Sequence, residues 1–243
     1  MHIGLVYASL LSERIAHMNE GVFYFRNEDT DDKREILNAA HIIIDGIKKF
    51  GIQIDEGIIG PDYADVGAYA PYTQSERGLI YQTYAKDLLA RGLAYPCFLS
   101  EEETTTIREE QTLAKQPMGI YGSYSPWRVA TFEEVQRALD EGKKYAIRLR
   151  SHGNPNKRVT IHDELRGDIE MQDNFMDMIL LKKTGIPTYH LAHVVDDHLM
   201  RTTLVTRADE WIASLPLHFQ MAHMLGFTPP KYLHISPLLK ADG

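Results

Sequence analysis

The chain has 243 residues, of which 44% are hydrophobic, so it holds enough apolar material for one large domain or for a domain with an insertion. Its formal net charge of −8 argues against nonspecific nucleic-acid binding, because affinity for the phosphate backbone rests on Lys and Arg, and its single cysteine, Cys97, excludes an intramolecular disulfide and a structural zinc site of several thiolates. With no apolar window long enough to span a bilayer and no signal peptide, we expect a cytoplasmic protein without a membrane partner.

The first segment, "MHIGL", leads into a helical pattern of apolar residues: Leu10, Leu11, Ile15 and Met18. Gly4 would let a ligand approach the helix N-terminus closely, where free N–H groups and the helix dipole favour phosphate. His2 could donate to the same anion. Taken alone, a His and a Gly at this place are more often a frayed chain end, so the alternative to an anion site stays open.

An acidic run follows the next apolar stretch, in "FYFRNEDTDD" at residues 23–32. We expect a buried strand that ends before Glu28, which places Glu28 and Asp29 at the carboxyl end of a strand, where open α/β sheets bind ligands. The alternative is helix capping by Asp31 or Asp32. The following helix is predicted from apolar residues three and four apart: Ile36, Ala40, Ile43, Ile47 and Phe50.

A loop over residues 57–71 precedes a second helix, which opens with the capping-box pattern of Thr73 and Glu76 and stops at Gly92. After Tyr95 the pattern changes to that of an α+β insertion. Two further capping boxes predict helices that end near residues 117 and 142, and alternation predicts strands at residues 144–150 and 158–164. These boxes pair Ser100 with Glu103 and Thr131 with Glu134.

The pattern of the first part returns after Gly185 and Pro187. We expect, in order, a helix at residues 190–200, a strand-rich segment at 202–211, an amphipathic helix at 215–227 and a short strand near 232–239.

A helix in this last part places Tyr189 and His193 on one face, with Asp196 and Asp197 one turn further on. The His and Asp residues here could suggest a metal site. The spacing of His190, His193 and Asp197 lacks the glutamate of a zinc-protease motif and offers no convincing third ligand, so we predict no bound metal.

Arg207 follows a strand-like stretch. At the end of a strand, its guanidinium could bind a carboxylate through two hydrogen bonds. The alternative is a surface salt bridge with Asp209 or Glu210.

Several ordered segments resemble the catalytic core of bacterial glutamyl-tRNA synthetases, which are class I aminoacyl-tRNA synthetases. The resemblance covers nearly all of the chain and rests on "HIG", "FYFRNEDTD", "YTQSERGLIYQTYAKDLLARGLAYPCF", "DELRGDIEM", "GIPTYHLAHVVDDHLM" and "TRADEWIASLPLHF". It implies an α/β fold: a Rossmann-type (HIGH-class) nucleotide-binding fold at residues 1–92 and 186–243, interrupted by an α+β acceptor-end-binding insertion at 93–185. An anticodon-binding domain is expected to be absent.

The resemblance also implies the glutamate-binding residues. Glu28 would hold the substrate ammonium, and Arg207 would pair with the side-chain carboxylate, which suits its planar fork. Tyr189 and His193 correspond to pocket residues, and the second of these positions is Asn in some relatives.

ATP would bind at residues that match the family's nucleotide site. His2 and Gly4 match the first and third positions of the HIGH-type motif and are the expected catalytic residues, with Leu5 where the last His of that motif would stand. Glu210, Trp211 and Leu239 fall where relatives hold ribose and adenine. The resemblance implies ATP with Mg²⁺, which would accompany ATP through its phosphates.

The implied reaction joins L-glutamate to tRNA(Glu). The glutamate α-carboxylate attacks the ATP α-phosphorus, pyrophosphate leaves, and the acyl group passes to the terminal ribose of the tRNA acceptor end. A monomer is expected. Expected tRNA contacts are Thr30, Arg148, Arg150, Lys157 and Arg158, and the alternative for the four basic residues is solvated strand edges and a loop tip.

Two departures from the family bear on activity. Relatives have a strand and a "PSPTG"-like loop before the HIGH-type motif and a "KLSKR"-like loop after the sequence "LLKADG". We therefore expect a core portion of a synthetase with weak activity of its own: a fragment, a gene with a misplaced start or a natural truncation. The alternatives are the paralogue that attaches glutamate to queuosine in tRNA, whose usual cysteine cluster is missing here, and a non-catalytic synthetase-like binding module.

Overall fold

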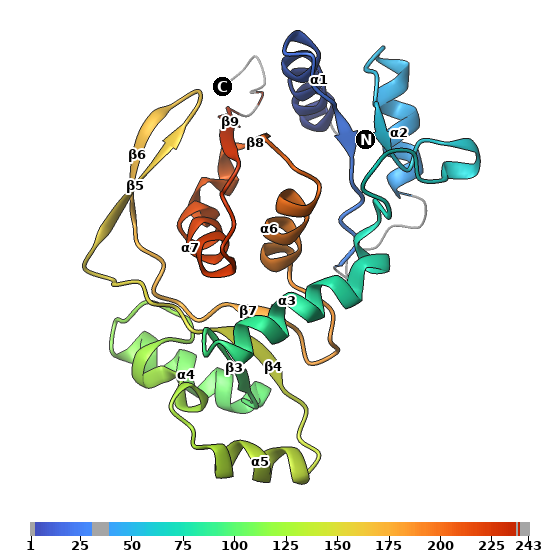
Figure 1. Cartoon of the computed structure of the whole chain (residues 1–243). Helices are drawn as coiled ribbons and strands as arrows, with labels where there is room; N and C mark the ends of the chain where they lie inside the picture. Colours follow the sequence, from blue (N-terminus) through green and yellow to red (C-terminus); the bar gives the residue numbers. More distant parts are fainter. Residues whose placement is uncertain (1–2, 31–38, 237, 239–243) are drawn as a thin grey trace.

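The computed structural model describes residues 3–30, 39–236 and 238. Helices alternate with short strands along most of this chain, and the strands form small separate sheets (Figure 1). This arrangement confirms the α/β class at the level of a mixed helix and sheet fold. Among the described residues, no helix is long and apolar enough to cross a membrane.

Within the described residues up to position 57, which form the first part of the chain, the structure has two helices and one parallel strand pair. Helix α1 (Ile3–Met18) is followed by strand β1 (Tyr24–Phe25), helix α2 (Ala39–Lys49) and strand β2 (Glu56–Gly57), and β1 pairs with β2. The expected buried strand at β1 is only two residues long and half-buried. Helix α2 confirms the apolar face at Ala40 and Ile47, with Ile43 partly buried against the same cluster. Phe50 was wrongly placed on this face: it follows the helix and is 58% exposed. Ile36, Asp31 and Asp32 lie outside the described residues.

The expected capping box at Thr73 is wrong. Its side chain makes no capping hydrogen bond, and a 3-10 turn at Gln74–Arg77 precedes helix α3 (Gly78–Ala90). Gln74 and Arg77 are buried and donate to Asp196, so tertiary contacts set the geometry of this turn. The helix stops before Gly92, as expected, and Gly92 has a positive φ of 71°.

Three antiparallel strands form the sheet of the middle part. The order is β3 (Ala94–Cys97), β4 (Ala146–Leu149) and β7 (Ile179–Leu181), and only β4 was predicted from alternation. The two helices beside it, α4 (Glu101–Leu113) and α5 (Phe132–Asp140), confirm both predicted capping boxes, at Ser100 and at Thr131. Helix α4 ends four residues before the expected boundary near residue 117.

The last part matches the sequence prediction element by element. Helix α6 (Tyr189–Leu199), strand β8 (Leu204–Ala208), helix α7 (Leu215–Leu225) and strand β9 (Lys231–Ile235) follow one another, with a 3-10 turn at Asp209–Ser214. Strands β8 and β9 are parallel. Helices α3, α6 and α7 enclose the largest apolar core, and its fully buried residues include Tyr81, Leu88, Leu180, Leu191, Val195 and Met221.

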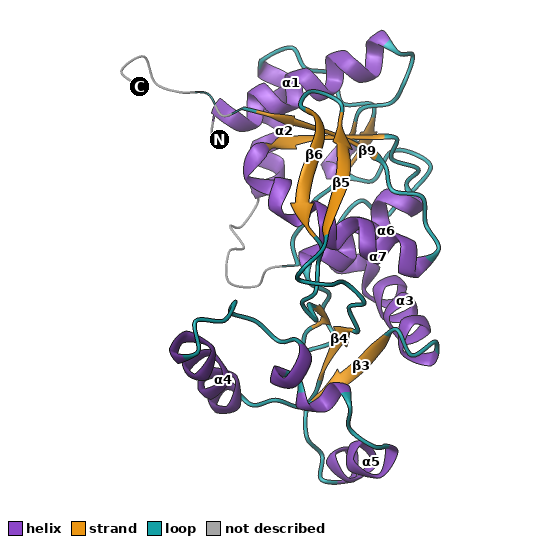
Figure 2. Cartoon of the chain, turned by 90° about the vertical axis from the view of Figure 1, so that its left-hand side faces the viewer, coloured by secondary structure: helices purple, strands orange, loops and turns teal. Residues whose placement is uncertain are grey.

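A hairpin from the middle of the sequence packs against the last part. It consists of β5 (Arg158–Asp163) and β6 (Gly167–Gln172), of which only β5 was predicted. Ile161 of β5 shares an apolar cluster with Leu215 of α7 and Tyr232 of β9. Figures 1 and 2 show the hairpin as a long ribbon on the same side of the molecule as β9. The limits of the insertion, at residues 93 and 185, remain a prediction. The hairpin lies within the predicted insertion but packs against residues that follow it.

Candidate active site

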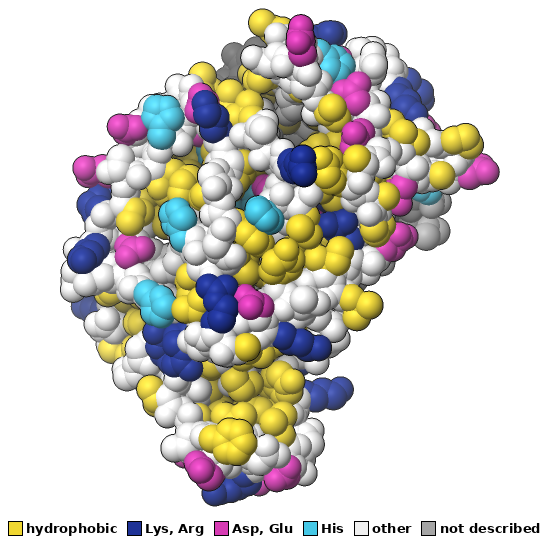
Figure 3. All heavy atoms as spheres, viewed as in Figure 1, with side chains coloured by type: hydrophobic (Ala, Val, Ile, Leu, Met, Phe, Trp, Pro, Cys, Tyr) yellow, Lys and Arg dark blue, Asp and Glu magenta, His cyan; other side chains and the backbone are white. Residues whose placement is uncertain are grey.

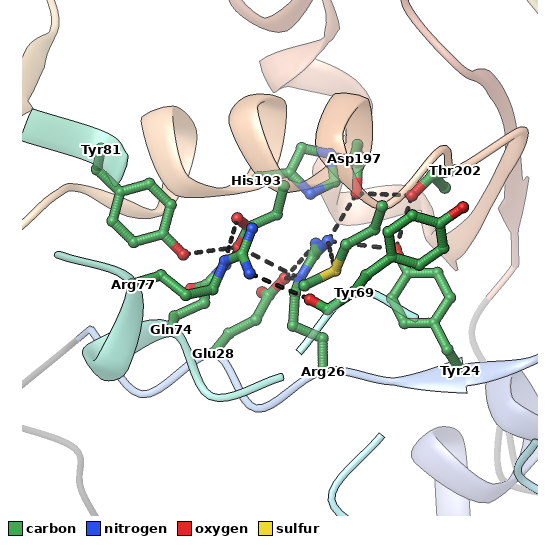
Figure 4. A network of polar contacts seen from close by, with 12 residues as sticks. Tyr24, Arg26, Glu28, Tyr69, Gln74, Arg77, Tyr81, His193, Asp197 and Thr202 are labelled. Atoms are coloured by element: carbon green, nitrogen blue, oxygen red, sulfur yellow. Dashed lines mark hydrogen bonds and ion pairs between the residues drawn. The ribbon is translucent and has the colours of Figure 1, made fainter. Parts of the chain in front are cut away.

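The candidate site is built around two consecutive aspartates of α6 that are both buried. Asp196 accepts hydrogen bonds from Arg77 Nε at 2.8 Å, Gln74 Nε2 at 3.0 Å and the Tyr81 hydroxyl at 2.7 Å. Figure 4 shows these three side chains converging below α6. A buried carboxylate that is paired and hydrogen-bonded in this way fixes its neighbours, so Asp196 ties α3 and its preceding turn to α6.

Asp197 connects α6 to the segment that carries Glu28. Arg26 Nη1 donates to Asp197 Oδ1 at 2.9 Å, and Arg26 Nη2 donates to Glu28 Oε1 at 2.8 Å (Figure 4). Burial raises the pKa of Asp197, and the Arg26 charge opposes that rise. Glu28 therefore lies at the end of a buried ionic chain, with its carboxylate at the protein surface.

His193 lies beside the ion pairs that join Asp197, Arg26 and Glu28. Its Nε2 is 3.2 Å from Asp197 Oδ2, but the contact is not aligned as a hydrogen bond, since Oδ2 has no hydrogen-bond partner within the described residues. Burial, followed by the charges of Arg26 and Arg207, lowers the pKa of His193 well below its ordinary value. The ring is therefore neutral at physiological pH.

Arg207 is a buried cation with neutral partners. Only 9% of the residue is exposed, and its guanidinium donates to His234 Nε2 at 3.0 Å, to the Tyr189 hydroxyl at 3.3 Å and to the Trp211 carbonyl at 3.3 Å. The guanidinium carbon also lies 4.7 Å from the centre of the Tyr232 ring. Among the described residues, no carboxylate forms an ion pair with Arg207. The surface salt bridge that was the alternative is wrong: Asp209 pairs with Arg166 at 3.0 Å, and Glu210 is exposed.

Aromatic rings surround the Arg207 side chain. The Tyr189 ring lies 4.6 Å from that of Trp211, 5.3 Å from that of His193 and 5.9 Å from that of His218, measured between centroids. Burial raises the pKa of Tyr189 to about 12, helped by the Glu28 carboxylate and opposed by Arg207. Its hydroxyl thus stays protonated and can accept from Arg207 while donating to a ligand.

Two further histidines keep this region free of additional positive charge. His190 Nδ1 and His218 Nε2 are 2.9 Å apart, and burial, reinforced by the Arg207 charge, lowers both pKa values. No group of His, Cys, Asp and Glu in the described part of the chain could hold a metal ion. The described side chains in direct contact with Arg207 are consequently all neutral: His234, Tyr189 and Tyr232.

The predicted site residues fall into three groups. Tyr189, His193, Arg207 and Trp211 lie together, and Glu28 joins them through Arg26 and Asp197. Gly4 lies in the first turn of α1, and Glu210 lies in the 3-10 turn beside Trp211. His2 and Leu239 lie outside the described residues.

The expected tRNA-contacting residues are dispersed. Arg148 donates to the Asp177 carbonyl at 2.8 Å, and the Arg150 guanidinium carbon lies 5.2 Å from the centre of the Tyr95 ring, so both stabilise the middle part. Thr30 is buried, and its carbonyl accepts from Lys182 Nζ at 2.8 Å. The exposed members are at the open end of the β5–β6 hairpin: Lys157 and Arg158.

Surface charge does not gather into one basic field on the face drawn in Figure 3, where Lys and Arg side chains lie among Asp and Glu. This agrees with the acidic net charge of −8. Any contact with nucleic acid on this face must therefore rest on a few local cations.

Sequence reasoning missed Arg26, Asp163 and His234. Arg26 stands two residues before Glu28, and its charge beside an acidic run was a usable signal. Asp163 and His234 carry no such signal. Strand pairing of β8 with β9 brings His234 to Arg207, and docking of the β5–β6 hairpin on β9 brings Asp163 to His234.

Comparison with known proteins gives consistent matches over the whole chain. The family model "tRNA synthetases class I (E and Q), catalytic domain" matches residues 1–243. The chain is 48% identical over 242 residues to glutamate–tRNA ligase from Clostridium perfringens strain 13 and 49% identical over 242 residues to that of Clostridium beijerinckii. Both alignments cover 100% of this chain and 44% of the relative, so the chain spans less than half the length of these relatives.

Solved structures give the same result. A glutamate tRNA ligase from Elizabethkingia meningosepticum, crystallised in complex with its amino acid, matches with a TM-score of 0.89 and 33% identity, over 100% of this chain and 48% of that one. Glutamate-tRNA synthetase from Elizabethkingia anophelis matches with a TM-score of 0.87 and 33% identity, over 100% of this chain and 49% of that one.

Proposed function

Because the chain belongs to the family of class I tRNA synthetases for glutamate and glutamine, whose catalytic domain it matches from residue 1 to 243, we propose that it activates L-glutamate with ATP and transfers it to tRNA(Glu). One observation carries the choice of glutamate: Arg207 is buried and pairs with no carboxylate among the described residues. A buried charge is costly unless it is paired, so this site favours a ligand that supplies an anion.

The glutamate side chain would lie against Nη1 and Nη2 of Arg207, each of which has a second N–H beyond its bond to the Tyr189 hydroxyl or the Trp211 carbonyl. His190, His193 and His218 are neutral, and the Tyr189 hydroxyl is protonated. None of these groups can therefore balance the Arg207 charge when the ligand brings no carboxylate. A glutamine side chain would leave Arg207 unpaired, which makes the neutral amino acid the weaker ligand.

The substrate ammonium would bind at Glu28. Arg26 holds Glu28 Oε1 through Nη2 at 2.8 Å and Nε at 3.2 Å, which leaves Oε2 available to a second cation. We assign roles to Tyr189 and His193 in the same pocket, where they contact the aliphatic part of the substrate and the Arg207 side chain.

ATP would bind at the N-terminus of α1 and along the 3-10 turn that follows β8. The residues assigned to it are His2, Gly4, Glu210, Trp211 and Leu239. The dipole at the N-terminal end of a 16-residue helix favours phosphate oxygens. Mg²⁺ would enter with ATP, bound through its phosphates.

The chemistry consists of two displacements. A glutamate α-carboxylate oxygen bonds to the α-phosphorus as the bond to pyrophosphate breaks, which gives glutamyl-adenylate. A ribose hydroxyl of the tRNA end then attacks the acyl carbon, AMP leaves, and the hydroxyl proton is lost to the surroundings. Orientation of both substrates is the main contribution expected of such a site.

The tRNA acceptor end would contact the region at residues 93–185. Lys157 and Arg158 are the exposed cations of the set that also includes Thr30, Arg148 and Arg150. Half-burial of Arg148 and Arg150 favours a supporting role for these two.

Calorimetric titration with amino acids tests the assignment of Arg207. Arg207→Ala should weaken L-glutamate by about tenfold to a hundredfold, since a hydrogen bond to a charged group contributes roughly 1.5–3 kcal/mol. Arg91→Ala is the matched control, because Arg91 is an exposed arginine that pairs with Asp87, four residues earlier on α3, at 2.8 Å. ATP affinity should change little in either variant. Equal loss of glutamate and ATP affinity in Arg207→Ala would contradict the assignment.

A further inference from the structure

Three buried side chains from three strands form one hydrogen-bonded chain that ends at Arg207. Arg207 Nε of β8 donates to His234 Nε2 of β9 at 3.0 Å, and His234 Nδ1 lies 2.7 Å from Asp163 Oδ2 of β5. The parallel register of β8 and β9 makes Arg207 and His234 direct partners. Asp163 reaches them because the β5–β6 hairpin packs on β9.

The donor pattern fixes the proton on His234. A guanidinium N–H can only donate, so His234 Nε2 must be the unprotonated acceptor. The proton of the neutral ring is then on Nδ1, from which it is donated to Asp163 Oδ2. Burial lowers the pKa of His234, the hydrogen bond to Asp163 opposes this, and the Arg207 charge lowers it further.

Asp163 is itself rigidly held. Its Oδ1 accepts from the backbone N–H groups of Leu165 at 3.1 Å and Arg166 at 3.0 Å, and its Oδ2 accepts from the backbone N–H of His234 at 3.1 Å. Burial alone would raise the pKa of Asp163, but the hydrogen bond from the His234 ring and the backbone bonds from Arg166 and Leu165 together lower it. The carboxylate therefore cannot turn toward Arg207 and form a direct ion pair.

We propose that Asp163 and His234 are positioning residues that hold Arg207 at Nε, so that the second N–H groups of Nη1 and Nη2 face the side-chain carboxylate of the substrate. The first N–H groups of these two atoms donate to the Tyr189 hydroxyl and the Trp211 carbonyl. This inference rests on the proposed function. The neutral imidazole gives Arg207 an acceptor without neutralising it, which leaves its charge for the ligand. A carboxylate in place of the ring would pair with Arg207 directly and compete with glutamate.

Two substitutions at His234 separate positioning from folding. In His234→Gln, the amide oxygen reaches the place of Nε2 and can accept from Arg207 Nε. In His234→Asn, the shorter amide reaches the place of Nδ1 and can donate to Asp163, but Arg207 loses its acceptor. L-glutamate should bind at least about tenfold more weakly to His234→Asn, and within about threefold of the unmodified affinity to His234→Gln, on the scale of one hydrogen bond to a charged group.

Asp163→Asn tests the other end of the hydrogen-bonded series Asp163–His234–Arg207, which we call the relay. Every oxygen of Asp163 faces N–H donors, so the amide NH₂ of Asn must face one of them. We expect the NH₂ to face His234 Nδ1, because this ring nitrogen can give up its proton and accept, whereas the backbone N–H groups of Leu165 and Arg166 cannot. The proton of the ring then moves to Nε2, where it opposes Arg207 Nε–H. This variant should also weaken L-glutamate by at least about tenfold.

The matched control is His162→Asn, at the neighbouring residue of β5. His162 is exposed and pairs with Asp168 at 2.7 Å within the hairpin, away from Arg207. Its affinity for L-glutamate should stay within about threefold of the unmodified chain. The affinity for ATP should stay unchanged in all of these variants, since neither Asp163 nor His234 is among the residues assigned to ATP.

Several outcomes would overturn the inference. Unchanged glutamate binding in His234→Asn and Asp163→Asn, with weak binding in Arg207→Ala, would refute positioning and leave the proposed function intact. Equal weakening in His234→Asn and His234→Gln would indicate a structural role only. Failure of Arg207→Ala to weaken glutamate would instead contradict the proposed function. The ¹⁵N chemical shifts of the His234 ring in the unmodified protein report its tautomer without substrate. We expect the Nδ1–H tautomer, and an Nε2–H tautomer would refute the proposed hydrogen bonds.

Discussion

At the level of single residues, the histidines near Arg207 are held in their neutral form. His193 and His218 are buried, and burial is the largest cause of their lowered pKa values. The Arg207 charge acts in the same direction on both rings. A protonated histidine here would stand beside a buried guanidinium, so the native packing disfavours the charged ring.

This arrangement predicts a pH-dependent stability. A histidine whose pKa is lower in the folded than in the unfolded state binds fewer protons when folded, so stability is full above about pH 6.5 and falls as the pH drops toward the folded pKa. The free energy of unfolding, from urea denaturation between pH 8 and pH 5, should therefore decrease below about pH 6.5.

His218→Gln should reduce this dependence, because it removes one such group. Exposed His162→Gln is the control and should leave the slope unchanged, since 63% of its side chain is in contact with solvent. A slope that is the same in the unmodified chain and in His218→Gln would contradict the assigned cause.

Residues of the pocket were predictable where the signal was local. Tyr189 and His193 are four residues apart on α6, and this spacing placed both side chains on one face of the helix. The strand-like pattern before Arg207 placed it near the end of a strand, where β8 has it. The partners of Arg207 were not predictable. His234 is 27 residues from Arg207, and Asp163 is 71 residues from His234, and only strand register and hairpin docking bring them together.

At the scale of elements, capping was predictable where the helix end is exposed. Ser100 and Thr131 both form the reciprocal hydrogen bonds of a capping box. Thr73 has the same sequence pattern but no capping bond, because Gln74 and Arg77 of the following turn are drawn to buried Asp196. Tertiary hydrogen bonds to a buried carboxylate thus override a local motif.

The cap of α5 gives a direct test. Thr131→Ala removes the acceptor for the Glu134 N–H and should destabilise α5 by about 1 kcal/mol, measured by amide hydrogen exchange within the helix. Thr106→Ala in α4 is the matched control, because exposed Thr106 bonds only to the Glu102 carbonyl inside its own helix. It should be neutral or slightly stabilising, since Ala is the better helix former. Equal destabilisation by both substitutions would contradict the capping account.

At the scale of the whole molecule, the order of elements was largely readable from the sequence, but their association was not. All four elements of the last part were predicted, because each has a clear apolar period. The short strands β3 and β7 were missed, since four and three residues carry too little periodicity. The docking of the β5–β6 hairpin on β9 could not be inferred, because complementary surfaces and not local pattern decide it.

The proposed function is activation of L-glutamate with ATP by this fold. The most direct measurement is amino-acid-dependent exchange of labelled pyrophosphate into ATP by the chain, with Mg²⁺ and tRNA(Glu) supplied. Exchange should require L-glutamate and should be at least about tenfold slower with L-glutamine or L-aspartate, because neither places a carboxylate at the distance of the Arg207 edge. Exchange that is equal with the three amino acids, or that is absent with L-glutamate, would contradict the claim.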